Sequence, residues 1–133
     1  MAIIETTDQK SIGEIRNLVG LAFDATDIPD ATIAQDVFLG EANLYIEKEV
    51  TDHASKTGDD LKILQIAVMK RAAVNILAAA QRTQRFQVES ATAEMAQLSP
   101  SEAITHYSLE IAEHIGHLTN RTTGTVVTVV GKL

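Results

Sequence analysis

The stretch from Leu61 to about Gln84 constrains the fold more than any other part of the chain. It reads LKILQIAVMKRAAVNILAAAQRTQ and is apolar nearly all round, which is typical of a helix enclosed by other helices. Its small side chains would let neighbouring helices approach closely: Ala67, Ala72, Ala73, Ala78, Ala79 and Ala80. The polar exceptions, Lys70-Arg71 and Asn75, predict a face that meets solvent or another subunit.

The composition agrees with a single helical domain. A chain of 133 residues has room for one core, and with 4% aromatic residues and no tryptophan that core must be filled by small aliphatic side chains. Zero cysteines exclude a disulfide framework, a zinc–thiolate site and thiol catalysis. We therefore expect an all-α domain over residues 1–119, built from four helices, followed by a C-terminal extension over residues 120–133.

Two helices are expected before the central one. Ser11 and Glu14 have the spacing of a capping box, which predicts a first helix from Ser11 to about Gly20; Thr7 or Asp8 could cap an earlier start. A second helix is expected to begin at Asp30, after a turn at Ile28-Pro29, and to run to about Val50. Its apolar face would be supplied by Ile33, Val37, Phe38, Ala42, Tyr45 and Ile46.

The last helix has the clearest start signal in the sequence. Ser99 can cap it, Pro100 suits the first helical position, and Glu102 completes a capping box, so we expect a helix from Pro100 to about Thr119. The preceding segment, Arg85–Leu98, could continue the central helix. Because Phe86, Val88 and Ser90 alternate along it and Thr92 is β-branched, it is interpreted as an extended or irregular excursion.

The C-terminal extension differs from the rest of the chain. After the breaker Asn120–Gly124 comes a run of six β-branched residues, Thr125–Val130, which favours a strand. An unpaired strand needs a partner edge, either on another chain or on the 85–98 segment, and the two alternatives are compatible. The candidate partner-binding residues are Thr122, Thr123, Thr125, Val126, Val127, Thr128, Val129 and Val130.

Charge is distributed unevenly along the chain. Residues 1–60 hold thirteen acidic and four basic residues, whereas residues 61–133 hold seven basic and five acidic ones. Such a chain can pair with copies of itself, or its two halves can simply pack together within one molecule. The candidate subunit-interface residues are Lys70, Arg71, Arg82 and Arg85. The acidic balance, −7 overall, disfavours strong nucleic-acid binding.

Candidate chemistry is confined to the last helix. His106, His114 and His117 lie there among Glu110 and Glu113, at spacings that would allow two histidines and one carboxylate to bind a metal. An exposed face with Glu–His pairs accounts for the same pattern and is favoured. The sequence has no phosphate-binding loop and no catalytic motif, so we expect neither a cofactor nor an enzyme.

No targeting or membrane segment is expected. The N-terminus lacks the basic start and apolar run of a signal peptide. The longest nearly apolar stretch, residues 72–80, is too short to span a bilayer. These features predict a cytosolic chain.

The order of the elements resembles the head–tail adaptor proteins of tailed bacteriophages, also called connector or head-completion proteins. The resemblance covers roughly residues 7–119. It rests on an ordered set of short motifs: Glu14-Ile15-Arg16, Val19-Gly20-Leu21, Asp27-Ile28-Pro29-Asp30, Ile33, Phe38-Leu39-Gly40-Glu41-Ala42, Lys70-Arg71-Ala72 and Val88-Glu89-Ser90, followed by the amphipathic last helix.

This resemblance implies a structural virion protein without a cofactor. Such proteins assemble beneath the portal as a homo-oligomeric ring, a dodecamer, which extends the DNA channel and provides a docking surface for the next neck or tail protein. A C-terminal extension grips the portal, a role that would fall here on residues 122–133. DNA would be only passing cargo, and an acidic channel would let it slide. The protein would reside in the virion neck, and in the host cytoplasm during assembly.

An alternative function belongs to a different class. A cytosolic helical regulator could bind one partner protein through the Leu61–Arg85 helix and form a small oligomer such as a dimer.

Overall fold

The computed structural model describes residues 2–20, 28–83 and 100–119, with side chains described for 2–20, 28–80 and 101–119. Within these residues the fold is all-α and contains no strand, which confirms the predicted fold class. Its four principal helices are α1 (Gln9–Val19), α3 (Glu41–Glu49), α4 (Gly58–Thr83) and α6 (Pro100–Thr119). The shorter elements are α2 (Asp30–Ile33), the π-helix η1 (Asp36–Gly40) and the 3₁₀-helix η2 (His53–Ser55).

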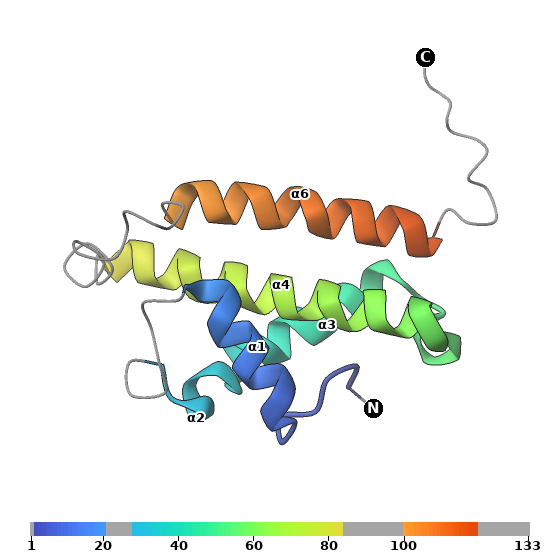
Figure 1. The fold of residues 1–133 in the computed structure, drawn as a ribbon, viewed down its shortest axis with the longest axis horizontal. Helices are drawn as coiled ribbons and strands as arrows, with labels where there is room; N and C mark the ends of the chain where they lie inside the picture. The colour runs from blue at the N-terminus through green and yellow to red at the C-terminus, as the bar shows by residue number, and fades with distance from the viewer. Residues whose placement is uncertain (1, 21–27, 84–99, 120–133) are drawn as a thin grey trace, which may run out of the picture.

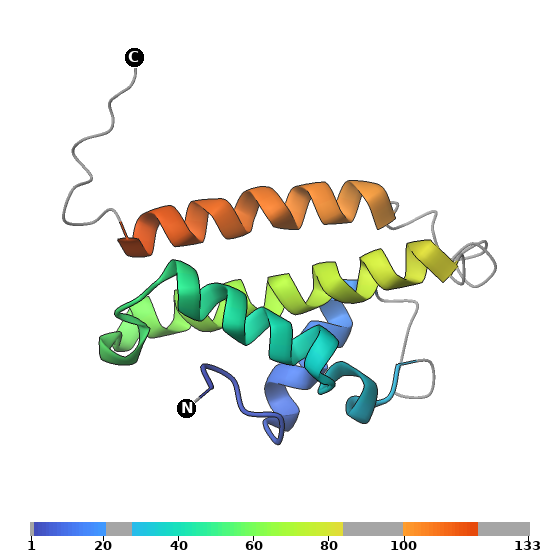
Figure 2. The same ribbon diagram turned by 180° about the vertical axis from the view of Figure 1, so that it is seen from behind.

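Helix α4 is the centre of the domain, as its sequence predicts. Figure 1 and the reverse view in Figure 2 show α6 along one side of α4, with α1, α2 and α3 on the other side. Helices α6, α1 and α3 and the π-helix η1 all pack against α4. Its alanines at 67, 72 and 73 are fully buried, so they form the close contacts for which small side chains are suited.

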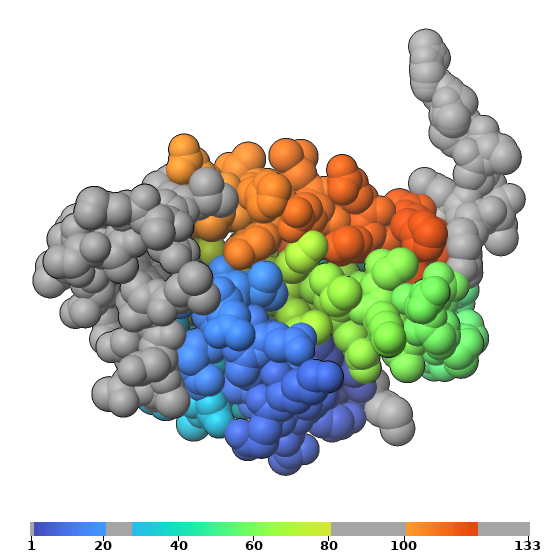
Figure 3. Space-filling view, viewed as in Figure 1, coloured from blue at the N-terminus to red at the C-terminus, as the bar shows by residue number. Residues whose placement is uncertain are grey.

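The end of α6 lies beside the beginning of α4, because the two helices run antiparallel. The space-filling view in Figure 3 shows the first turns of α4 at the surface next to the last turns of α6. Tyr107 also joins α6 to α1, since its hydroxyl donates to the carbonyl oxygen of Leu18 at 2.7 Å.

The first helix starts earlier than the Ser11 capping box predicts, and the alternative start at Asp8 is confirmed. Asp8 is the N-cap: its carboxylate accepts the backbone N–H of Ser11 at 3.2 Å and the Ser11 hydroxyl at 2.9 Å. These hydrogen bonds, the backbone one first, hold the pKa of Asp8 below its ordinary value. Because the N-cap carboxylate accepts the backbone N–H of the residue three positions later, Ser11 lies in the first turn of the helix and does not cap it.

The prediction of one continuous helix from Asp30 to Val50 is wrong. The chain breaks after α2 and re-enters as η1, whose wide turn is closed by a hydrogen bond from Gly40 N–H to Gln35 O at 3.2 Å. The break and the wide turn rotate the apolar face. Val37, expected in the core, is 65% exposed, while Leu39 is fully buried in its place.

One helix passes a length-and-composition test for crossing a membrane. Within the described residues, Gly58–Ala80 is long and apolar enough, and half of its most apolar stretch is buried inside the fold. The nearly apolar residues 72–80, on which the sequence-based expectation rests, are too short on their own to span a bilayer. The whole helix is long enough because a few polar residues are tolerated along it. The core helix of a globular domain meets the same criteria.

Candidate functional site

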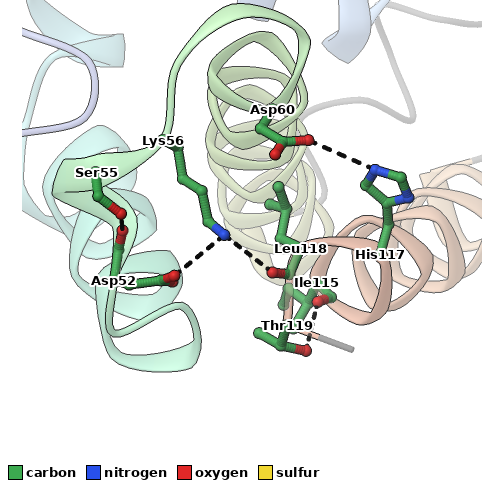
Figure 4. Close-up of polar contacts among 8 residues, drawn as sticks. All are labelled: Asp52, Ser55, Lys56, Asp60, Ile115, His117, Leu118 and Thr119. Atoms are coloured by element: carbon green, nitrogen blue, oxygen red, sulfur yellow. Dashed lines mark hydrogen bonds and ion pairs between the residues drawn. The ribbon is translucent and has the colours of Figure 1, made fainter. Parts of the chain in front are cut away.

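The exit of α6 is held by a buried lysine. The side chain of Lys56 is 4% exposed, and its Nζ donates to the carbonyl oxygen of Leu118 at 3.1 Å. The same Nζ lies 3.2 Å from Oδ2 of Asp52, whose side chain is 63% exposed (Figure 4). Lys56 thus bridges an acid at the surface and the last turn of α6.

A tight connection between α3 and α4 aims Lys56 at α6. The backbone turns through η2 by hydrogen bonds from His53 N–H to Val50 O and from Ser55 N–H to Asp52 O. The Ser55 hydroxyl also donates to Asp52 O at 2.8 Å. Lys56 then adopts an extended backbone, and Gly58, with φ +61°, starts α4. This sequence of turns leaves the Lys56 side chain directed into the interior.

The end of α6 provides the matching acceptor. The last carbonyl groups of an α-helix have no partner within the helix, and they carry the negative end of the helix dipole. Leu118 is 2% exposed, so its carbonyl group meets the lysine ammonium instead of bulk water. Thr119 donates its hydroxyl to Ile115 O, and Nε2 of His117 lies 3.6 Å from Oδ1 of Asp60 on α4 (Figure 4).

The predicted partner-binding extension begins directly after this end. All eight of its candidate residues, from Thr122 to Val130, lie outside the described residues, as does the excursion predicted over residues 85–98. The structure therefore describes the point that precedes the extension and leaves the strand prediction untested.

Two of the four candidate subunit-interface residues have partners within the chain. Arg71 makes a bidentate contact with Glu41, Nε to Oε1 at 3.0 Å and Nη2 to Oε2 at 2.9 Å, and its guanidinium lies 4.0 Å from the centre of the Tyr45 ring. Lys70 binds Glu110 at 2.9 Å. Packing of the two halves within one molecule thus accounts for Arg71. A role of either residue between subunits stays a prediction, as it does for Arg82 and Arg85, whose side chains are not described.

The contacts of Arg71 extend to the π-helix. Asn75 donates to Glu41 Oε1 at 2.8 Å and to the Phe38 carbonyl oxygen, in η1, at 3.1 Å. Hydrogen bonds from Arg71 are the main reason that the pKa of Glu41 is lowered, and the same pair raises the pKa of Arg71. Arg71 and Asn75, two of the polar exceptions in the apolar helix, therefore form a polar network with Glu41. This network fixes η1 and α3 against α4.

The three histidines of α6 each have a different partner. His106 Nε2 lies 2.9 Å from Glu110 Oε2, which is a Glu–His pair one turn earlier than the Glu110–His114 spacing. His114 contacts Lys70, and His117 contacts Asp60. Among the described residues no group of three or more histidine, cysteine, aspartate or glutamate side chains is arranged to hold a metal ion.

Sequence reasoning missed Lys56 and Asn43. Lys56 lies in the polar segment between the second expected helix and the central one, where a buried side chain is not expected. Asn43 is a 6%-exposed amide that accepts the backbone N–H of Ile4 and donates to Ile4 O, both at 3.0 Å. The one available signal was a polar residue within the apolar spacing of the second helix, between Ala42 and Ile46.

Comparison with protein-family models, with curated proteins and with solved structures yields no match to this chain.

Proposed function

We propose that this chain is a structural subunit of the neck of a tailed bacteriophage. It forms a ring between the portal and the tail, extends the DNA channel, and docks the next neck or tail protein. Residues 122–130 pair with the portal as an added strand. The resemblance in the ordered motifs motivates this function.

The observation that carries the proposal is the fixed end of α6. A domain that grips a partner through a terminal extension needs a rigid base for it, since ordering the base during binding would reduce the affinity. Lys56 and Leu118 provide such a base directly before residue 120. The end of this helix is thus held by a long-range contact between residues 62 positions apart in sequence.

The charge of the described surface supports a channel function. Exposed acids occur on several elements: Glu5, Glu14, Asp36, Glu49, Asp52, Asp59, Glu102 and Glu113. An acidic surface repels the phosphates of DNA, so a ring that presents it to the channel would let DNA pass without binding it.

The regulator alternative is less well supported. It requires α4 to bind a partner, but α4 is packed by α1, α3, η1 and α6 within the domain. Among the described side chains of α4, Ile66 is the one exposed large hydrophobic residue, at 37%. Little apolar surface of this helix is left for another protein.

Co-sedimentation with the portal ring of the same phage tests the proposal. The full chain should pellet with the portal, and electron microscopy should show a second ring stacked on the portal's narrow end. A chain lacking residues 120–133 should fold, with unchanged helical circular dichroism, and should no longer pellet. The matched control carries the same fourteen residues in scrambled order, and it should also fail to bind.

Two results would contradict the proposal. If the truncated chain pelleted with the portal as well as the full chain does, the extension would not be the anchor. If the full chain formed only a closed dimer and never a ring with the portal at high concentration, the regulator function would replace it.

A further inference from the structure

We propose that Lys56 is a positioning residue that fixes the last turn of α6, and thereby the point from which residues 120–133 leave the domain. The inference rests on the proposed function of that extension, and it adds to it a specific residue that presets the extension for its partner. Lys56 would not contact the partner itself.

The burial of Lys56 is the first reason. Lysine is almost never fully buried unless it is paired, because removing its ammonium group from water is costly. Here the side chain is 4% exposed and its residue is one of two buried polar or charged residues in the described part of the chain, the other being Asn43. Its ammonium group is paired with an acid at the surface and with a backbone carbonyl oxygen, so the contact fixes where the α3–α4 connection meets the end of α6.

The choice of acceptor is the second reason. The carbonyl groups at the end of an exposed helix are ordinarily satisfied by water at little cost. In this chain Leu118 O is instead bound by an ammonium group from a segment 62 residues earlier. The contact is charge-assisted and lies at the negative end of the helix dipole, so it opposes fraying of the last turn.

The position of the contact is the third reason. Figure 4 shows Lys56 and the Asp60–His117 pair reaching the last turn of α6 from either side of the start of α4. The Asp60–His117 contact is longer, 3.6 Å, and its histidine is 54% exposed. The Lys56–Leu118 contact is therefore the stronger of the two. Its loss should release the end of α6 without disturbing the rest of the helix.

Lys56→Met tests the inference, because methionine retains an apolar stem and removes the ammonium group. Amide hydrogen exchange measures the protection of residues 116–119 against that of Ala67 and Val68 in α4, which report the stability of the whole domain. The expected result is a loss of protection of about tenfold at 116–119 relative to α4, in line with loss of a charged hydrogen bond. The affinity for the portal should fall at least about fivefold because the extension must then be ordered on binding.

Two further variants complete the experiment. His117→Gln, at the same helix end, should change the relative protection less than about twofold. Asp52→Ala keeps the lysine, alters a side chain that is 63% exposed, and removes the neutralising charge, so it should lower the relative protection about threefold. It serves as the test if Lys56→Met does not fold.

The outcomes separate this inference from the proposed function. Unchanged relative protection at 116–119, or lowered protection with unchanged portal affinity, overturns the positioning role of Lys56. Undiminished portal binding by the chain lacking residues 120–133 overturns the proposed function, and with it the consequence of the lysine contact for binding.

Discussion

The Nζ atom of Lys70 lies 3.0 Å from Nε2 of His114, across the contact between α4 and α6. A lysine ammonium group can only donate, so Nε2 must accept, which requires a neutral imidazole with its proton on Nδ1. Burial, followed by the positive charge of Lys70, lowers the pKa of His114 below its ordinary value. The other charged or titratable groups around His114 are Glu110, Glu113 and His117 on α6.

This contact predicts a loss of stability on acidification. The unfolded chain protonates His114 near pH 6.5, whereas the folded chain resists protonation to a lower pH, so unfolding takes up a proton between the two values. The free energy of unfolding should therefore fall between pH 7.5 and pH 5.5, as measured by urea denaturation. The lowered pKa of Glu110 costs stability only as the pH falls below about 4.5, which is outside this interval.

The variant His114→Gln isolates the effect. The carboxamide oxygen of glutamine can accept from Lys70 without titrating, so the variant should lose less stability over the same pH interval than the parent. His53→Gln, in η2, is the matched control for replacing a histidine by glutamine. An equal pH dependence in the parent and His114→Gln would refute the role of His114.

A buried amide should be essential for anchoring the N-terminal segment. Asn43→Ala removes both hydrogen bonds to the Ile4 backbone, and Ile4 is 2% exposed, so water cannot readily replace them. We expect the free energy of unfolding to fall by about 2–4 kcal/mol in urea denaturation at pH 7. Asn17→Ala, on the exposed face of α1, should change it by less than about 0.5 kcal/mol.

If Asn43→Ala lowered the free energy of unfolding no more than Asn17→Ala does, the two hydrogen bonds would not be needed for stability. Asn43→Asp adds a check on direction, because its carboxylate would face the Ile4 carbonyl oxygen. Its destabilisation should lessen at acid pH, where the protonated carboxyl group can donate again.

The elements set by local sequence were predictable. The apolar pattern of α4 and the serine–proline–glutamate start of α6 depend on residues near one another in the chain. Helix α6 has the expected bounds, and α4 begins at Gly58, three residues before the predicted Leu61. The side chains of Ala103, Ile111 and Leu118 face the core, as the spacing in α6 predicts.

The features that depend on distant partners were not predictable. Lys56 is buried where its ammonium group meets the carbonyl group of Leu118, 62 residues later, and Asn43 is buried where it meets the backbone of Ile4. The π-helix likewise accompanies a hydrogen bond from Asn75 of α4 to Phe38 O. No local pattern encodes these pairings. Helical periodicity alone therefore predicts a buried Val37 and omits Leu39 from the apolar face, whereas the structure exposes Val37 and buries Leu39.

The pair of Arg71 and Glu41 should not tolerate lysine in place of arginine. Lysine cannot reproduce the bidentate geometry or stack equally well over the Tyr45 ring. Because the side chains are 28% and 41% exposed, we expect Arg71→Lys to lower the free energy of unfolding by only about 1 kcal/mol. A double-mutant cycle with Glu41→Gln should give a coupling energy of about 0.5–1 kcal/mol, and a coupling near zero would contradict the pairing.

Two glycines should respond in opposite directions to the same substitution. A Cβ atom added at Gly13 or at Gly58 would meet nothing within 4 Å, so neither change creates a clash. Gly13 lies within α1, where alanine should raise the free energy of unfolding by about 0.5–1 kcal/mol because the unfolded chain loses freedom.

Gly58 has φ +61°, so Gly58→Ala should lower the free energy of unfolding by about 1–2 kcal/mol through backbone strain alone. Gly58→Asn should recover part of that loss, since asparagine tolerates the left-handed region. Thermal and urea denaturation of the three variants decide the matter, and stabilisation by Gly58→Ala would show that α4 does not begin with a left-handed residue.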